Sequence, residues 1–337
     1  MSFQLTRHNA TLGIATLAAV SVAIAGLTAW WKKKQARGRI PSKWKRVGEI
    51  MEIYCFPIKS CGVIRLTEGQ CTTLGLQNGM LRDRVFMVTD LKNNFVTGRA
   101  YPKMTQIRPS INEAIFSLEA PGMLSICIDM KQLTQGKLIT AKVWGQPVKA
   151  VDCGEEAATW FSRCLLGEET GLRLVYFPSA APCRPVRQNN AVFETILEED
   201  SGALPDATSF SLLSESSVAD LNRRLEKEVT ALQFRPNFVV RGTYSPYEEE
   251  DWEWIQIGEA VFRNIKPCTR CVFTTVDPYN GQKDPGMQPL KELRSYKLIM
   301  DEKLRPFTGE SPVMGIHLGL RKHGMVKVGD PVYAGVS

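Results

Sequence analysis

The sequence predicts a strand-dominated α+β body that follows a single membrane anchor. Three observations carry this prediction: β-type runs separated by turn residues from residue 47 onward, few amphipathic helical stretches, and a long uncharged N-terminal segment. Such runs are typical of β-barrels or meanders, whereas a doubly wound sheet would alternate strands with helices. The sequence contains no glycine-rich dinucleotide fingerprint, no phosphate loop and no internal repeat.

The N-terminal segment has the features of a signal-anchor. Residues 8–31 contain no Asp, Glu, Lys or Arg, and about 20 apolar residues suffice to span a bilayer. Trp30-Trp31 followed by Lys32-Lys33-Lys34 is how a membrane span ends on its cytoplasmic side. We therefore predict an anchor over residues 1–31, a basic linker over 32–47, and a body that faces the cytosol.

Two alternatives to an anchor are a cleaved secretory signal and a mitochondrial presequence. Ala23-Ile24-Ala25 resembles a cleavage site, but the basic cluster lies on the wrong side for a secretory signal. A presequence would be an Arg-rich amphipathic helix, and this segment is apolar all round. The mitochondrial outer membrane is compatible with this anchor, although the charges do not distinguish it from the peroxisome or another membrane.

Charge and cysteine usage exclude several classes for the body. Of 42 Lys and Arg residues, nine lie within residues 1–46, which leaves 33 basic against 35 acidic residues in the remainder. This balance argues against nucleic-acid binding, because such a body normally carries clustered basic residues. Nine scattered cysteines fit free thiols better than a disulfide scaffold, and three histidines are too few for a His-rich zinc site.

The body is predicted to contain a series of strands and two helices. The first strand, Ile50–Phe56, ends at Pro57, and a hairpin is expected to join 84–89 to 94–97. Further strands are expected over 124–128, 139–144, 148–151, 172–177, 238–240, 254–257, 260–264, 325–328 and 332–333. Helices are expected over 155–166 and 214–231, and 178–205 reads as a long connection.

The motif Pro267-Cys268-Thr269-Arg270-Cys271 is the first candidate for chemistry. A lone Cys-x-x-Cys could be half of a zinc site, a thioredoxin-like pair or two buried structural thiols. No second Cys-x-x-Cys completes a zinc site, and the β-branched run Thr274-Thr275-Val276 predicts a strand where a thioredoxin-like pair needs a helix. Arg270 favours a functional site, because a guanidinium beside a sulfur favours the thiolate and offers a fork for an anion.

Four other short stretches are candidates for binding, although each by itself is ambiguous with ordinary surface. Lys59-Ser60-Cys61-Gly62 offers an ammonium, a hydroxyl and free backbone N–H groups, which suit a phosphate. The remaining stretches are Leu81-Arg82-Asp83-Arg84, Asp206-Ala207-Thr208-Ser209 and Gln233-Phe234-Arg235-Pro236-Asn237-Phe238.

Together with Val328-Gly329-Asp330-Pro331-Val332-Tyr333, these stretches resemble the MOSC superfamily over residues 48–335. Among its members, the chain is most similar to membrane-anchored reductases of N-oxygenated compounds. The resemblance implies a MOSC-associated β-rich domain over 48–177 and a MOSC β-barrel domain over 178–335.

The resemblance also implies a cofactor, Mo-molybdopterin, and residues that hold it. Cys271 takes the role of the catalytic thiolate that ligates molybdenum, and Cys268 that of a neighbouring structural thiol. The positions matching those that hold the cofactor are Lys59, Ser60, Arg84, Asp206, Thr208, Ser209, Arg235, Asn237, Thr269, Arg270 and Cys271. His317 lies where the family's chain approaches the cofactor, with a surface histidine as the alternative.

The implied activity is reduction of amidoximes, N-hydroxyguanidines and hydroxylamines, extending to nitrite. No flavin or haem motif is evident, and the resemblance points to cytochrome b5 and NADH-cytochrome b5 reductase as electron donors at the mitochondrial outer membrane. One alternative is a cofactor carrier or sulfurtransferase-like module without reductase activity. Another is a tethered binding protein in which Cys268 and Cys271 are core thiols.

Overall fold

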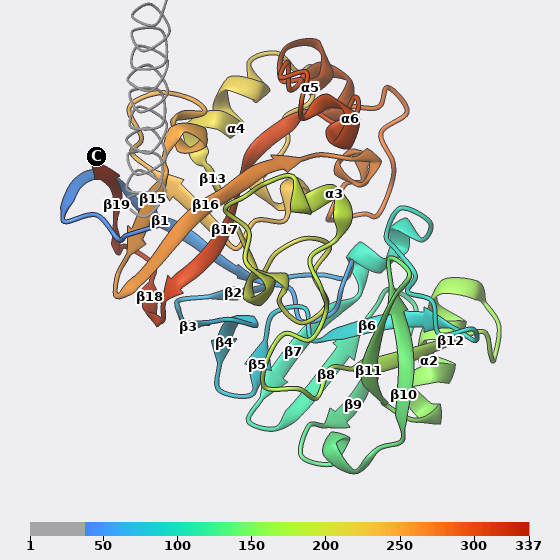
Figure 1. Ribbon diagram of the computed structural model, residues 1–337. Coiled ribbons are helices and arrows are strands. Elements are labelled where there is room, and N and C mark those ends of the chain that lie inside the picture. The colour runs from blue at the N-terminus through green and yellow to red at the C-terminus, as the bar shows by residue number, and fades with distance from the viewer. Residues whose placement is uncertain (1–37, 337) are drawn as a thin grey trace, which may run out of the picture. The chain divides into compact units, whose positions relative to one another are not determined.

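A computed structural model of the chain describes residues 38–336, and the predicted anchor lies outside this part of the chain. No helix within residues 38–336 is both long and apolar enough to cross a membrane. The segment 43–336 forms a compact unit in which strands dominate (Figure 1). The predicted strand-rich α+β body is therefore confirmed.

A closed barrel is the largest element of this unit. Its strand order is β14-β13-β17-β16-β15-β19-β1, and pairing of β1 with β14 closes the ring. All neighbouring strands are antiparallel except β13 and β14, which are parallel. The bounds are β1 Lys43–Cys55, β13 Phe210–Ser214, β14 Phe238–Arg241, β15 Trp254–Ile257, β16 Ala260–Thr269, β17 Val313–Lys322 and β19 Pro331–Val336, with β2 Ile64–Leu66 paired to β1.

The remaining strands form three smaller sheets. The β10-β11-β12-β6 sheet comprises Leu138–Val143, Gln146–Asp152, Leu172–Tyr176 and Phe86–Asp90. The β18-β3-β4-β5 sheet comprises Gly324–Lys327, Glu68–Thr72, Gly75–Asn78 and Leu81–Arg82. The β7-β8-β9 sheet comprises Arg108–Asn112, Ile115–Glu119 and Ile126–Asp129. Figure 1 shows β6–β12 gathered on one side of the barrel strands.

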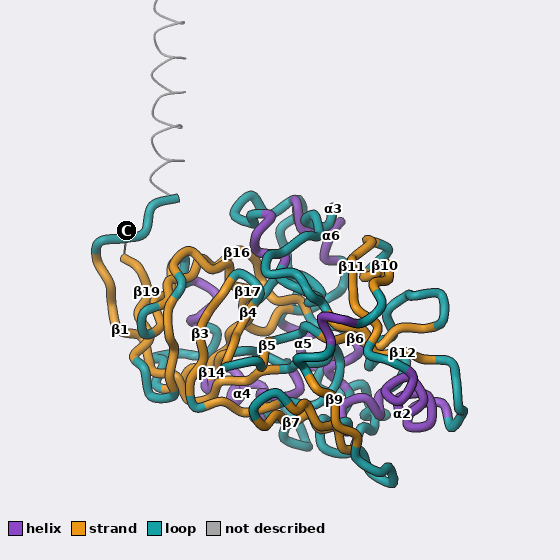
Figure 2. Tube along the Cα trace, turned by 90° about the horizontal axis from the view of Figure 1, so that it is seen from below, coloured by secondary structure: helices purple, strands orange, loops and turns teal. Residues whose placement is uncertain are grey.

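The helices are short and lie around the strands (Figure 2). They are α2 Glu155–Leu166, α3 Gln188–Ala191, α4 Glu215–Asn222, α5 Leu290–Tyr296 and α6 Arg305–Thr308. Single 3-10 turns lie at Pro102–Gln106, Leu133–Gln135, Glu198–Ser201, Ala231–Phe234, Glu248–Asp251 and Val272–Thr275. Helix α2 has the predicted bounds, and Gly167 ends it in the left-handed conformation at φ +75°.

The buried residues at the end of β1 contribute to two different hydrophobic cores. Ile50 and Ile53 belong to the core that fills the barrel, whereas Tyr54 and Phe56 pack into a second core with α4 and α5. A third core lies under the sheets β6–β12 and extends to Ala203 and Leu204. The end of β1 therefore reaches the place where the three cores approach one another, and the site described below is built there.

Three local predictions differ from the structure, and several strands were not predicted. Strand β1 begins at Lys43, inside the stretch predicted as linker, because Lys43–Arg46 pair with β19. The helix predicted over 214–231 ends at Asn222. The strand predicted at 274–276 is wrong, since Val272–Thr275 form a 3-10 turn in which the Thr274 and Thr275 hydroxyls donate to backbone carbonyls three residues earlier. Strands β2, β3, β4, β7, β8 and β17 were not predicted.

Candidate active site

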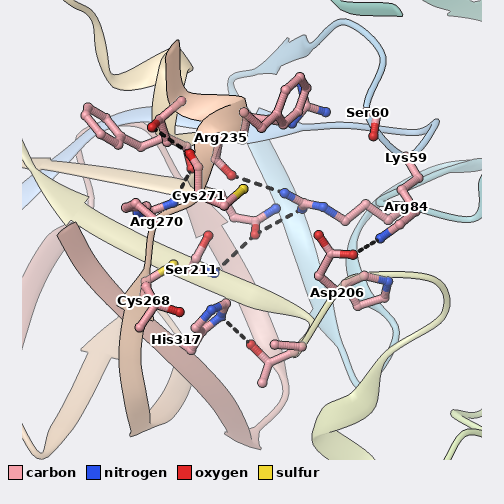
Figure 3. A pocket seen from close by; sticks show the side chains of 18 of the residues that line it. Lys59, Ser60, Arg84, Asp206, Ser211, Arg235, Cys268, Arg270, Cys271 and His317 are labelled. Carbon is pink, nitrogen blue, oxygen red and sulfur yellow. Dashed lines mark hydrogen bonds and ion pairs between the residues drawn. The ribbon is translucent and has the colours of Figure 1, made fainter. Parts of the chain in front are cut away.

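A pocket gathers most of the predicted site residues from segments far apart in the sequence (Figure 3). The chain turns that follow β1 and β5, the loop before β13, the turn before β14, the end of β16 and the middle of β17 all contribute side chains. Of the eleven predicted residues, ten line it: Lys59, Ser60, Arg84, Asp206, Thr208, Arg235, Asn237, Thr269, Arg270 and Cys271. The structure thus brings together positions that span more than 200 residues of sequence.

The backbone at this pocket is held in an uncommon conformation. Ser60, Arg84 and Arg235 have φ values of +70°, +50° and +52°, a region that residues with a side chain rarely adopt. Each such residue costs on the order of 1–3 kcal/mol, and strain of this kind gathers at functional sites. Three in one pocket indicate that the fold maintains this geometry for binding or catalysis.

Lys59 lies buried at one end of the pocket and is held by two oxygens. Its Nζ donates to Asp206 Oδ1 at 2.5 Å and to the Leu204 carbonyl at 3.1 Å. Trp144, from the turn between β10 and β11, donates its Nε1–H to the same Asp206 oxygen at 2.8 Å. Burial lowers the pKa of Lys59 to about 8, although the Asp206 carboxylate opposes this change. The ammonium is therefore charged at neutral pH.

Two guanidinium groups form the centre of the pocket. Arg84 pairs with Asp83 and donates to the Arg235 carbonyl at 3.1 Å. Both Arg84 and Arg235 stack on Phe56, at 4.9 and 4.1 Å from the ring centroid. Burial and the neighbouring Arg84 lower the pKa of Arg235 to about 9, and its Nη2 is buried without a hydrogen-bond partner. An unpartnered buried donor beside other cations is a site for an anion.

The two thiols of the Cys-x-x-Cys motif differ in exposure. Strand β16 extends through Thr269, which places Cys268 inside the sheet with 4% of its surface exposed. Cys271 follows the strand end and is exposed, and both thiols border the pocket. Residues 38–336 contain no group of three or more His, Cys, Asp or Glu side chains that could hold a metal ion.

Comparison with known proteins assigns the family. Residues 47–168 match the MOSC N-terminal beta barrel domain, and residues 199–333 match the MOSC domain. Mitochondrial amidoxime-reducing component 1 of Mus musculus is 37% identical over 96% of this chain and 91% of its own length. Mitochondrial amidoxime reducing component 2 of Bos taurus is 38% identical over 90% and 88%, and component 1 of Homo sapiens 35% identical over 96% and 92%.

The chain belongs to the amidoxime-reducing component family of MOSC-domain proteins. The matched stretches include Lys59, Arg84, Arg235 and Cys271, so the pocket is built from both matched regions. The predicted resemblance to the MOSC superfamily is confirmed.

Two residues of this MOSC-family chain that were predicted to hold the cofactor, Arg270 and Ser209, have hydrogen-bond partners that the sequence did not indicate. Arg270 was expected to present its fork to an anion, but its Nε and both Nη atoms donate to the carbonyls of Met314 and Phe234. Its guanidinium thus fixes the neighbouring chain beneath the pocket. Ser209 does not line the pocket, because its hydroxyl is turned away to donate to the Thr73 carbonyl at 2.6 Å.

The structure adds pocket residues that the motifs did not single out. Ser211 lies on β13, and the Phe273 ring lies 5.6 Å from the Arg235 guanidinium. Phe273 packs against Gly98, where a Cβ atom would approach the ring to 2.3 Å. Ser211 and Gly98 lie outside the motifs. The only sequence signal for the packing of Phe273 against Gly98 is that a glycine leaves room for an aromatic ring.

Arg184 is a further residue that sequence reasoning missed. It lies in the predicted connection 178–205 and is 4% exposed. Its guanidinium donates to the carbonyls of Ser201, Ala203 and Pro205, at 3.0, 3.1 and 2.9 Å. These three bonds fix the loop that ends at Asp206, so Arg184 positions the partner of Lys59.

Proposed function

We propose that this chain is a molybdenum-dependent reductase of N-oxygenated compounds. The proposed substrates are amidoximes, N-hydroxyguanidines, hydroxylamines and nitrite. Relatives with 35–38% identity over nine tenths or more of the chain are named mitochondrial amidoxime-reducing components, which supports this class of reaction. The runner-up, a carrier that holds the same cofactor without turnover, is separated from it by the experiment below.

The observation that carries the proposal is the unpartnered Nη2 of Arg235 in the same pocket as the exposed thiol of Cys271. Molybdopterin combines an anionic phosphate with sulfur ligands for the metal. A soft thiolate suits molybdenum, and buried cations suit the phosphate. Lys59, Ser60, Arg84 and Arg235 would hold the anionic end, and Cys271 would ligate the metal.

When bound, the cofactor supplies the two-electron redox chemistry. The protein side chains bind and orient the reactants. Reduction of an amidoxime consumes two electrons and two protons and gives an amidine and water. Phe273, two residues after Cys271, also lines the pocket and provides apolar surface for the organic part of a substrate.

The proposed location is the outer mitochondrial membrane, with the body facing the cytosol. The relatives' printed names support a mitochondrial location, and the predicted anchor over 1–31 supports attachment to a membrane. Cytochrome b5 and NADH-cytochrome b5 reductase are the proposed electron donors. Anchoring donor and acceptor on one membrane raises their effective concentration without requiring a strong interface.

Metal and pterin analysis of the full-length protein, purified in detergent, tests the proposal. We expect about one molybdenum per chain, and benzamidoxime reduction when cytochrome b5, its reductase and NADH are added. Absence of both molybdenum and pterin would overturn the proposal. A loaded protein without turnover would identify the carrier instead.

A further inference from the structure

Arg235 lies between two cavities of the molecule. One is the pocket of Figure 3, which Cys271 and His317 also line, so the alternative of a surface position for His317 is wrong. The other, which we call the second cavity, has a volume of about 240 Å³. Its walls come from the turn after β1, strand β2, the 3-10 turn Pro102–Gln106, the start of β7, and residues 232, 235, 278 and 279. Of the residues that the structure describes, Arg235 alone lines both cavities.

The two aromatic rings beside the Arg235 guanidinium belong to different cavities. Phe56 lines the second cavity, and its ring centroid is 4.1 Å from the guanidinium carbon. Phe273 lines the pocket of Figure 3, and its ring centroid is 5.6 Å from the same carbon. The guanidinium therefore forms part of the wall between the two cavities.

The Arg235 guanidinium has more donors than one ligand can use. It carries five N–H groups in a planar fork, and no atom within residues 38–336 accepts a hydrogen bond from them. A carboxylate or phosphate takes two parallel hydrogen bonds along one edge of such a fork. An anion in the pocket of Figure 3 thus leaves N–H donors of Arg235 for a ligand in the second cavity.

Two further arginines line the second cavity, Arg65 and Arg108. Arg65 is 3.5 Å from Glu52, and 56% of its side chain is exposed. Arg108 is exposed, and its side chain makes no hydrogen bond or ion pair within the described part of the chain. None of the described residues that line this cavity is an Asp or Glu. Three guanidinium groups around one cavity repel one another, and an anion between them would offset that repulsion.

The rest of the lining suits an organic group. Phe56, Val63 and Leu232 form an apolar wall, and the exposed side chains of Arg108 and Tyr279 leave the cavity open to solvent. A protein cavity of about 150 Å³ accommodates benzene. A volume of about 240 Å³ therefore admits an aromatic ring together with a carboxylate group.

We propose that the second cavity binds a small organic anion, an aromatic or aliphatic carboxylate. The carboxylate pairs with the three arginines, and the apolar part of the ligand packs against the apolar wall. Because Arg235 would serve an anion on each side, a carboxylate in the second cavity should weaken anion binding in the pocket of Figure 3. The reverse effect has the same size, since coupling between two binding sites is reciprocal.

Binding of 4-fluorobenzoate to the full-length protein in detergent, followed by fluorine NMR, tests the proposal. We expect saturable binding of this anion and none of the neutral 4-fluorobenzyl alcohol at the same concentration. Arg108→Gln should weaken binding about threefold to tenfold, and Val63→Trp should abolish it by filling the cavity. Arg305→Gln, at an exposed arginine of α6 outside both cavities, is the matched control and should leave the affinity unchanged.

Lys59→Gln distinguishes the two cavities, because Lys59 lines only the pocket of Figure 3. This variant should not lower the affinity for 4-fluorobenzoate. A loss in Lys59→Gln as large as that in Arg108→Gln would assign the ligand to the pocket of Figure 3 and overturn the proposal.

Three other results would also contradict the proposed site. They are unchanged affinity in Arg108→Gln, equal binding of the neutral alcohol, and equally strong competition by inorganic phosphate, which would show that the apolar wall does not contribute. Arg108 is exposed, so its substitution leaves the core intact even if Val63→Trp does not fold. These measurements require neither molybdenum nor turnover, and their outcome is independent of the proposed reaction.

Discussion

Cys268 is buried, whereas Cys271 is exposed. The first prediction is therefore that substitutions of these two cysteines have different effects. We expect Cys271→Ser to lose molybdenum and abolish turnover, because a serine oxygen is a poor substitute for a soft thiolate. Cys268→Ser should retain much of both, since this thiol is buried in β16 and 4% exposed. Metal content and benzamidoxime reduction, measured together, check this. Cys183→Ser, at an exposed thiol outside the pocket, is the control, and equal losses at 268 and 271 would undo the ligand assignment.

A second prediction concerns the pH dependence of anion binding. The pKa of Lys59 is lowered to about 8, so its ammonium is charged below that pH and becomes neutral above it. The affinity of cofactor-free protein for inorganic phosphate should therefore fall as pH rises through about 8, in calorimetric titrations at constant ionic strength. Lys59→Arg should keep its charge and lose this step. A step that persists in Lys59→Arg would assign it to another group.

The residue types in the pocket could be predicted from the sequence, but the directions in which their side chains point could not. Lys59, Arg84, Arg235 and Cys271 belong to motifs whose chemistry suits an anion and a metal, and all four line the pocket. Arg270 has the same charge, yet its donors are directed to backbone carbonyls of 234 and 314. Those carbonyls come from distant segments, so the motif contains no information about them.

At the scale of elements, helix α4 shows how a side chain overrides periodicity. The apolar spacing of Val218, Leu221, Leu225 and Val229 predicts a helix over 214–231, but α4 ends at Asn222. The Asn222 side chain accepts from Val229 N at 2.9 Å and donates to Val229 O at 3.0 Å. These bonds stabilise a loop over 223–229. Leu225 and Val229 still pack into the same core as Val218.

The third prediction follows from this loop. Asn222→Ala should lower the free energy of unfolding by about 1–3 kcal/mol, because it leaves the buried amide and carbonyl of Val229 without partners. Urea denaturation monitored by circular dichroism measures the change. Arg223→Ala, at a neighbouring side chain that is 76% exposed, should change stability by less than about 0.5 kcal/mol. An Asn222→Ala protein as stable as wild type would show that these two hydrogen bonds do not stabilise the loop.

For the whole molecule, local patterns predict the strands better than their partners. Alternation and turn residues indicate strands at 50–56 and 238–240, and both form. The barrel closes because these strands, β1 and β14, pair with each other. Their separation of nearly 190 residues lies beyond any local pattern, so the sequence predicts a barrel or a meander without deciding between them. The same closure brings Lys59 and Arg84 to Arg235.

The last prediction tests whether a ligand in the pocket contacts both the barrel side and the side formed by the core under β6–β12. Lys59 follows Ile58 and Arg84 precedes Val85, and both of these apolar residues belong to the core under β6–β12. Arg235 and Cys271 lie on the barrel side of the pocket. A ligand that binds only the folded state stabilises it by about 2.7 kcal/mol at a free concentration about one hundred times Kd.

Because the ligand would contact both sides of the pocket, cofactor loading should slow amide hydrogen exchange in segments 56–62 and 81–86 as well as in 233–237. Mass spectrometry of loaded and stripped protein measures this, with exposed turn 120–124 as the unaffected control. Protection confined to 233–237 would show that the cofactor binds the barrel alone.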